Sequence, residues 1–159
     1  LENIFNRTGL IEMTGMTEKD VIIFVRGEQY YDGAAPDETE LMTEGSMTIA
    51  GDGGIILEYQ ETELTGMEGT TTRFTIRDDT VTLTRAGGVN SQMIFQRGKR
   101  HSSLYETPWG TMTVDIATTT LAYRLSSQGG VLEIKYTIAV DHQVTGENQF
   151  KIRVRERTR

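Results

Sequence analysis

The stretch MIFQRGKRHSSLYETPWGTMTVDIATTTLAYRLSSQGGVLEIKYTIAV, residues 93–140, alternates apolar side chains with Thr, Glu, Lys and Asp. Turn-forming residues interrupt this alternation at Gly98-Lys99, Pro108-Trp109-Gly110 and Gly129-Gly130. A period of two between such turns is typical of consecutive antiparallel strands. The stretch therefore predicts a β-meander.

The longest strand pattern in this stretch, Thr111 to Ser126, changes its apolar face along the way. Its apolar residues occupy even positions up to Ile116 and odd positions from Leu121. A shift of one residue moves every following side chain to the other face of a sheet. We therefore expect a β-bulge within Thr118-Thr119-Thr120, where a long strand bends around a barrel corner.

The same period of two continues on both sides of the stretch. Apolar faces recur along Asp20–Tyr31, Leu41–Ile49, Ile55–Tyr59, Thr70–Arg77, Thr80–Ala86 and Asn148–Val154. About ten strands, frequent turns and no sustained helical period predict an all-β fold. Because an open sheet of this size would expose long edges, we expect a single antiparallel meander closed into a β-barrel of about eight to ten strands.

The length of 159 residues is typical of one domain. We expect this barrel domain to span residues 16–159. Residues 1–15 show no clean period, which predicts either an N-terminal arm or a segment of recombinant origin.

The composition argues against several classes of partner. With 16 Lys and Arg against 23 Asp and Glu, the formal charge is -7, so neither nucleic acid nor an anionic membrane surface is expected to bind. The chain has no Cys, which removes disulfides and thiolate ligands and fits a cytoplasmic protein. No pattern calls for a cofactor, and a homodimer remains open.

Four segments carry a resemblance to a known family. They are GMEGTTT (66–72), RAGGVNSQMIFQRGKRH (85–101), YETPWG (105–110) and the closing GGVLEIKYTIAVDHQVTGENQFKIRVRE (129–156). The chain resembles the YwiB-like family of small bacterial β-barrel proteins of unknown function over roughly residues 19–156. The resemblance implies a calycin (lipocalin-like) barrel and transfers no active-site residue.

The candidate catalytic and metal-binding residues lack the patterns that their chemistry needs, so we expect a protein that is not an enzyme. His101, Ser102, Ser103 and Asp115 invite comparison with a hydrolase triad, but the chain has no nucleophile elbow. We read the acidic residues between Glu58 and Asp79 as a solvated sheet edge, because they lack calcium-loop spacing. No catalytic or metal-ligating residue is predicted.

Basic residues alternate along the last strand pattern at Lys151, Arg153, Arg155, Arg157 and Arg159. One reading is a docking stripe for an acidic partner or RNA. The other, which we favour, is an outward face whose cations pair across the sheet with carboxylates such as Glu133 and Asp141.

The inward faces of the predicted strands combine apolar bodies with polar handles. We expect this interior to hold a small apolar or amphipathic acid, with a ligand-binding set of Tyr59, Arg85, Met93, Phe95, Tyr105 and Tyr136. The alternative is that the Arg85 side chain has a structural role and pairs with Glu61 instead of binding a ligand. At the level of the whole protein, the alternative is a structural or regulatory protein that acts through its outer surface without a ligand.

Overall fold

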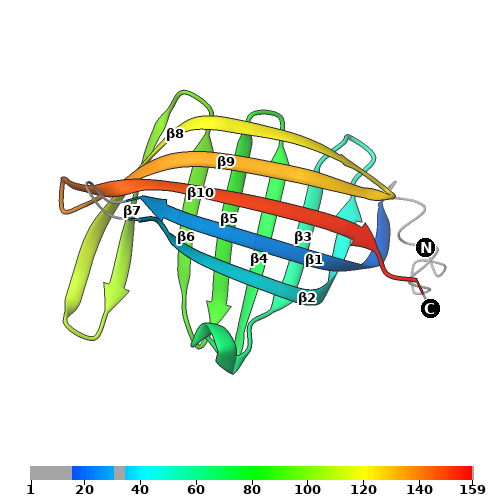
Figure 1. Cartoon of the computed structure of the whole chain (residues 1–159), viewed down its shortest axis with the longest axis horizontal. Helices are drawn as coiled ribbons and strands as arrows, with labels where there is room; N and C mark the ends of the chain where they lie inside the picture. Colours follow the sequence, from blue (N-terminus) through cyan, green and yellow to red (C-terminus); the bar gives the residue numbers. More distant parts are fainter. Residues whose placement is uncertain (1–15, 31–34, 159) are drawn as a thin grey trace, which may run out of the picture.

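A computed structural model describes residues 16–30 and 35–158, and within them ten antiparallel strands form one curled sheet (Figure 1). The strands are β1 (Thr17–Tyr30), β2 (Asp37–Ile49), β3 (Ile55–Gln60), β4 (Thr70–Arg77), β5 (Thr80–Gly87), β6 (Ser91–Gln96), β7 (Arg100–Thr107), β8 (Gly110–Ser126), β9 (Gly129–Val140) and β10 (Gln143–Glu156). A 3-10 turn, η2 (Glu63–Thr65), precedes β4, and the described residues contain no α-helix. The predicted all-β, calycin-like barrel is confirmed.

The strand order in the sheet is β6-β5-β4-β3-β2-β1-β10-β9-β8-β7. The first strand, β1, and the last, β10, therefore pair with each other at the centre of the sheet. Figure 1 shows the long strands β8, β9, β10, β1 and β2 side by side, with the shorter β3 to β6 crossing behind them. The turn between β6 and β7 nearly closes the barrel against β8. Its Gly98 amide donates to the Thr118 carbonyl at 2.9 Å, and the Thr118 amide donates to the Lys99 carbonyl at 3.1 Å.

The predicted bulge in β8 is confirmed, because the register between β8 and β9 shifts between Thr118 and Thr120. Before the shift Ile116 faces inward, opposite Ile138, and after it Leu121 faces inward, opposite Ile134. The extra residue keeps the apolar side chains of a long strand on the inner face while the sheet bends.

The core fills the barrel with aliphatic and aromatic side chains from nine strands. Its largest fully buried members are Phe74, Phe95, Ile23, Met47, Leu57, Ile76, Leu83, Ile116, Leu121, Leu132, Ile134 and Ile152. Phe95 makes an edge-on contact with Tyr136 at a centroid distance of 4.8 Å, and Phe150 approaches both rings. These contacts make the aromatic cluster a packed part of the interior.

A glycine permits close approach of two strands at Gly45 on β2. A Cβ atom at this position would lie 2.4 Å from the Glu58 carbonyl oxygen and 2.7 Å from Cδ1 of Ile23. Because the nearest atom belongs to the backbone, it cannot swing aside as a side chain can. Gly45 therefore lets β3 fold tightly against β2.

Two expectations concern the ends and the surroundings of the barrel. Residues 1–15, the predicted arm or recombinant segment, lie outside the described residues. In the described part of the chain, no helix has the length and apolar character needed to cross a membrane.

Candidate functional site

The six residues of the predicted ligand-binding set divide by their exposure. Tyr59, Phe95 and Tyr136 are buried in the core. Arg85, Met93 and Tyr105 are only partly buried, the last two packed at the edge of the core. The structure thus places three members of the set in the buried core and three at positions that are partly exposed to solvent.

Strand register brings the first polar members of this set into one row. Tyr59 on β3 pairs with Thr72 on β4, and Thr72 pairs with Arg85 on β5. Side chains opposite one another in antiparallel strands lie on the same face. Tyr59, Thr72 and Arg85 therefore share one inward face, with Glu61 just beyond the end of β3.

Arg85 meets a carboxylate but does not hydrogen-bond to it. Its Nε atom lies 3.9 Å from Oε2 of Glu61, and its side chain is 19% exposed. Among the described residues this buried Nε atom has no hydrogen-bond partner. The structural pairing expected as the alternative role is therefore present only as a loose ion pair.

The carboxylate of Glu61 is already occupied by other donors. The Thr65 hydroxyl donates to Oε1 at 3.0 Å, and the buried Thr72 hydroxyl donates to Oε2. The Glu61 side chain is 1% exposed. A buried carboxylate needs such donors, and here two neutral hydroxyls supply them, while Arg85 contributes its charge from 3.9 Å.

Burial and the nearby charges of Arg85 and Glu61 shift the pKa values of the two buried phenols, Tyr59 and Tyr136. Burial raises the pKa of Tyr136 to about 12, and the positive charge of Arg85 opposes that rise. Burial also raises the pKa of Tyr59, and Glu61 adds to the rise while Arg85 opposes it. Both phenols are therefore neutral donors at ordinary pH, close enough to Arg85 to sense its charge.

Two further buried polar atoms flank Tyr136 on the neighbouring strands. Tyr136 pairs with Thr118 on β8 and with Asn148 on β10. The Thr118 Oγ1 and Asn148 Nδ2 atoms have no hydrogen-bond partner within the described residues. The sequence set lacks both residues, although Asn148 at an inward position of the last strand is a signal that could have found it.

Of the candidate hydrolase residues, Ser102 and Asp115 lie together, whereas His101 hydrogen-bonds with Gln96 at 2.8 Å. The Ser102 hydroxyl donates to Oδ1 of Asp115, and Nδ1 of His142 lies 3.3 Å from Oδ2 of the same carboxylate. A triad needs the imidazole between hydroxyl and carboxylate so that it can take the serine proton. Here Asp115 stands in the middle, and the hydrogen bond from Ser102, followed by the contact with His142, lowers its pKa.

The acidic residues between Glu58 and Asp79 form no common site, because Glu58 and Asp79 each bind different neighbouring side chains. Glu58 forms an ion pair with Arg73 at 2.6 Å, and Asp79 accepts hydrogen bonds from Thr80 and Gln96. Within residues 16–30 and 35–158, no three His, Asp or Glu side chains gather closely enough to hold a metal ion.

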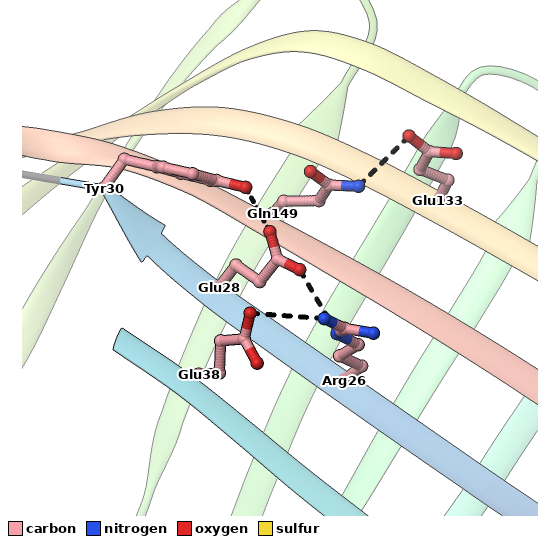
Figure 2. A network of polar contacts seen from close by, with 6 residues as sticks. All are labelled: Arg26, Glu28, Tyr30, Glu38, Glu133 and Gln149. Carbon is pink, nitrogen blue, oxygen red and sulfur yellow. Dashed lines mark hydrogen bonds and ion pairs between the residues drawn. The ribbon is translucent and has the colours of Figure 1, made fainter. Parts of the chain in front are cut away.

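The pairing expected for the basic stripe is wrong in part. Asp141 accepts from the Thr113 amide at 3.1 Å instead of meeting a cation of the stripe. Glu133 lies opposite Lys151 in the register of β9 and β10 but accepts a hydrogen bond from Gln149 at 3.3 Å. Figure 2 shows this contact between Gln149 and Glu133. The positive φ angle of Asp141 explains the first error, because it places this residue in the tight turn between β9 and β10.

Comparisons with known proteins agree with the fold. A model of the domain of unknown function DUF1934 matches residues 23–152. The crystal structure of the ywiB protein from Bacillus subtilis superposes with a TM-score of 0.76 at 17% identity, covering 92% of this chain and 99% of that chain. At this identity the likeness shows the fold alone, and no curated protein matches the chain. Since the family model spans most of the barrel, the chain belongs to the DUF1934 family, and its resemblance to the YwiB-like proteins is confirmed.

Proposed function

We propose that this protein is a non-catalytic binding module that holds a small amphipathic acid at the Arg85 end of the barrel interior. The observation that carries the proposal is the buried Arg85 Nε atom without a hydrogen-bond partner in the described structure. An unsatisfied buried donor costs about 1 to 3 kcal/mol, more when it is charged. An anionic head group would remove that cost.

The surroundings of Arg85 support an acid in preference to a neutral ligand. Glu61 is held by Thr65 and Thr72, so a second carboxylate could take the free side of the guanidinium without displacing an existing bond. An arginine fork can bind a carboxylate through two parallel hydrogen bonds. The partly exposed Arg85 side chain gives such a group access from solvent.

The apolar neighbours support a ligand with a hydrocarbon or aromatic body. Met93 and Tyr105 are partly buried and pack against the core that contains the buried rings of Phe95 and Tyr136. Concave sites with an apolar lining and few convergent polar groups are typical of small-molecule binding. We also propose a cytoplasmic location, because a chain that has no Cys forms no disulfides and suits a reducing compartment.

Calorimetric titration with matched probes tests the proposal. Decanoate and cinnamate should bind the wild-type protein, whereas decanol, which lacks the charge, should bind at least about tenfold more weakly. Arg85→Met should abolish acid binding, and Arg85→Lys should restore part of it. Arg124→Met, which removes the same charge from an exposed position of β8, is the control and should bind as wild type does.

Two results would overturn the proposal. One is a wild-type protein that binds neither acid at millimolar concentration. The other is an Arg85→Met variant that no longer folds, because Arg85 would then be a structural core residue held by Glu61. A melting curve of each variant, recorded before the titration, separates loss of binding from loss of fold.

A further inference from the structure

A groove of about 650 Å³ lies on the outer face of the strands β2, β1, β10 and β9. We call it the outer groove. Register arranges its outward side chains in transverse rows. The first row is Met42, Phe24, Arg153 and Val131, and the second is Glu40, Arg26, Lys151 and Glu133. Figure 2 shows Arg26 and Glu133 of the second row on this face, with the rest of the barrel behind them.

The first row presents apolar surface to solvent. Met42 is 67% exposed at one wall of the groove, and Val131 is 47% exposed at the other. Between them the Arg153 guanidinium lies over the Phe24 ring, with Cζ 4.6 Å from the ring centroid, and Cζ of Arg155 lies 5.7 Å from the same centroid. The floor is therefore an aromatic ring covered by two cations.

These two cations differ from the other arginines of this face. Arg26 pairs with Glu28 and Glu38, each at 3.2 Å, and Arg157 pairs with Glu44 at 3.3 Å. Among the described residues, Arg153 and Arg155 form no ion pair. In a chain with a formal charge of -7, two neighbouring unneutralised guanidinium groups make a local site for negative charge.

The spacing of the walls sets the size of an occupant. Three strand intervals separate β2 from β9, and at about 4.8 Å each they place the walls roughly 14 Å apart. An α-helix with its side chains is about 10 to 12 Å wide. One helix therefore fits between Met42 and Val131, with its lower face on Arg153 and Lys151.

We propose that the outer groove binds an acidic amphipathic helix of a partner protein. Carboxylates spaced one helical turn apart would meet Arg153 and Arg155, and apolar side chains on the same face would contact Met42 and Val131. The groove suits RNA less well, because a guanidinium covers the Phe24 ring, which therefore offers no open face on which a base could stack. This inference concerns a surface separate from Arg85 and does not depend on an interior ligand.

A designed peptide of about 18 residues is a suitable probe, with Glu at successive helical turns beside Leu at positions i and i+4. A second peptide replaces every Glu with Gln. Fluorescence anisotropy should show that the acidic peptide binds at least about tenfold more tightly and weakens as salt rises. The double variant Arg153→Gln/Arg155→Gln should lose about tenfold or more in affinity for it.

A charge-reversal pair separates docking from stability. Val131→Glu should weaken binding of the acidic peptide by about tenfold, whereas Val131→Lys should strengthen it severalfold. Gln92→Glu and Gln92→Lys make comparable charge changes on β6, outside the groove, and should leave the affinity within about twofold. Opposite effects of Glu and Lys at one position cannot arise from a general loss of fold.

Four outcomes would overturn the inference. The acidic peptide could fail to bind at millimolar concentration, or the Gln peptide could bind equally well. The Gln92 variants could change affinity as much as the Val131 variants do, which would indicate a diffuse charge effect. Sedimentation could instead reveal a wild-type dimer that Val131→Glu dissociates, which would make a second copy of the chain the occupant.

Discussion

Arg85 Nε and Glu61 Oε2 lie 3.9 Å apart, close enough for an ion pair and too far for a hydrogen bond. Glu61 instead receives hydrogen bonds from Thr65 and Thr72. Within the described residues, the barrel thus contains a carboxylate whose hydrogen bonds come from neutral donors beside a guanidinium whose Nε has none. This mismatch distinguishes the site from a structural salt bridge, in which each charged group satisfies the other.

Alkaline pH should destabilise the barrel through its buried phenols. Because the pKa of Tyr136 is about 12 in the folded chain and about 10 in an unfolded one, the folded state retains its proton longer. The stabilisation is therefore complete below about pH 10 and is lost as pH rises toward about 12. Urea unfolding across this range should show the decline, and Tyr136→Phe should reduce its slope. An unchanged slope would contradict the assignment.

Acid pH should act through Asp115. Its pKa is lowered by the hydrogen bond from Ser102 and the contact with His142, so it contributes stability above its unfolded pKa of about 3.9. That contribution is lost as pH falls through the lower folded value. Asp115→Asn should flatten the acid limb of a stability curve, whereas Asp37→Asn on the exposed start of β2 serves as the control. Equal effects of the two changes would show that Asp115 has no special role.

The aromatic cluster should be a principal source of stability. Phe95 is fully buried and touches Tyr136 and Phe150, so Phe95→Ala should lower the free energy of unfolding by about 3 to 5 kcal/mol. Leu104→Ala, at a position that is 72% exposed, should change it by less than about 0.5 kcal/mol. A loss below about 1 kcal/mol at Phe95 would mean that the interior is loosely packed.

Gly45 should tolerate no side chain. Gly45→Ala places a methyl group 2.4 Å from the Glu58 carbonyl and should cost about 1 to 3 kcal/mol of unfolding free energy. Ser46→Ala, the next residue on the opposite face of β2, adds no volume and should be nearly neutral. Chemical denaturation of both variants checks the prediction. A stable Gly45→Ala protein would show that β2 and β3 can separate at little cost.

The sequence was sufficient to predict features that depend on local period. The change from even to odd apolar positions predicted the bulge between Thr118 and Thr120, because a sheet has only two faces. Inward placement of Tyr59 and Phe95 followed from the same period. These features need no knowledge of which strands are neighbours.

Contacts between strands distant in sequence could not be predicted in this way. Arg153 lies over Phe24 because β10 pairs with β1, a register that no local pattern specifies. The same limit explains why the sequence pairs Asp141 with the cations of the basic stripe and why the ligand-binding set lacks Thr118. Whether Glu61 satisfies Arg85 depends on Thr65 and Thr72, whose hydroxyl directions are set by tertiary packing.

The most direct measurement is the ¹H–¹⁵N NMR signal of the Arg85 Nε–H group, assigned by its absence in Arg85→Lys. We predict that decanoate shifts this proton downfield and slows its exchange with solvent, because the buried Nε gains a hydrogen-bond acceptor, whereas decanol leaves it unchanged. A signal that is already slow to exchange without ligand, and that decanoate does not move, would contradict the proposal that Arg85 receives an acid.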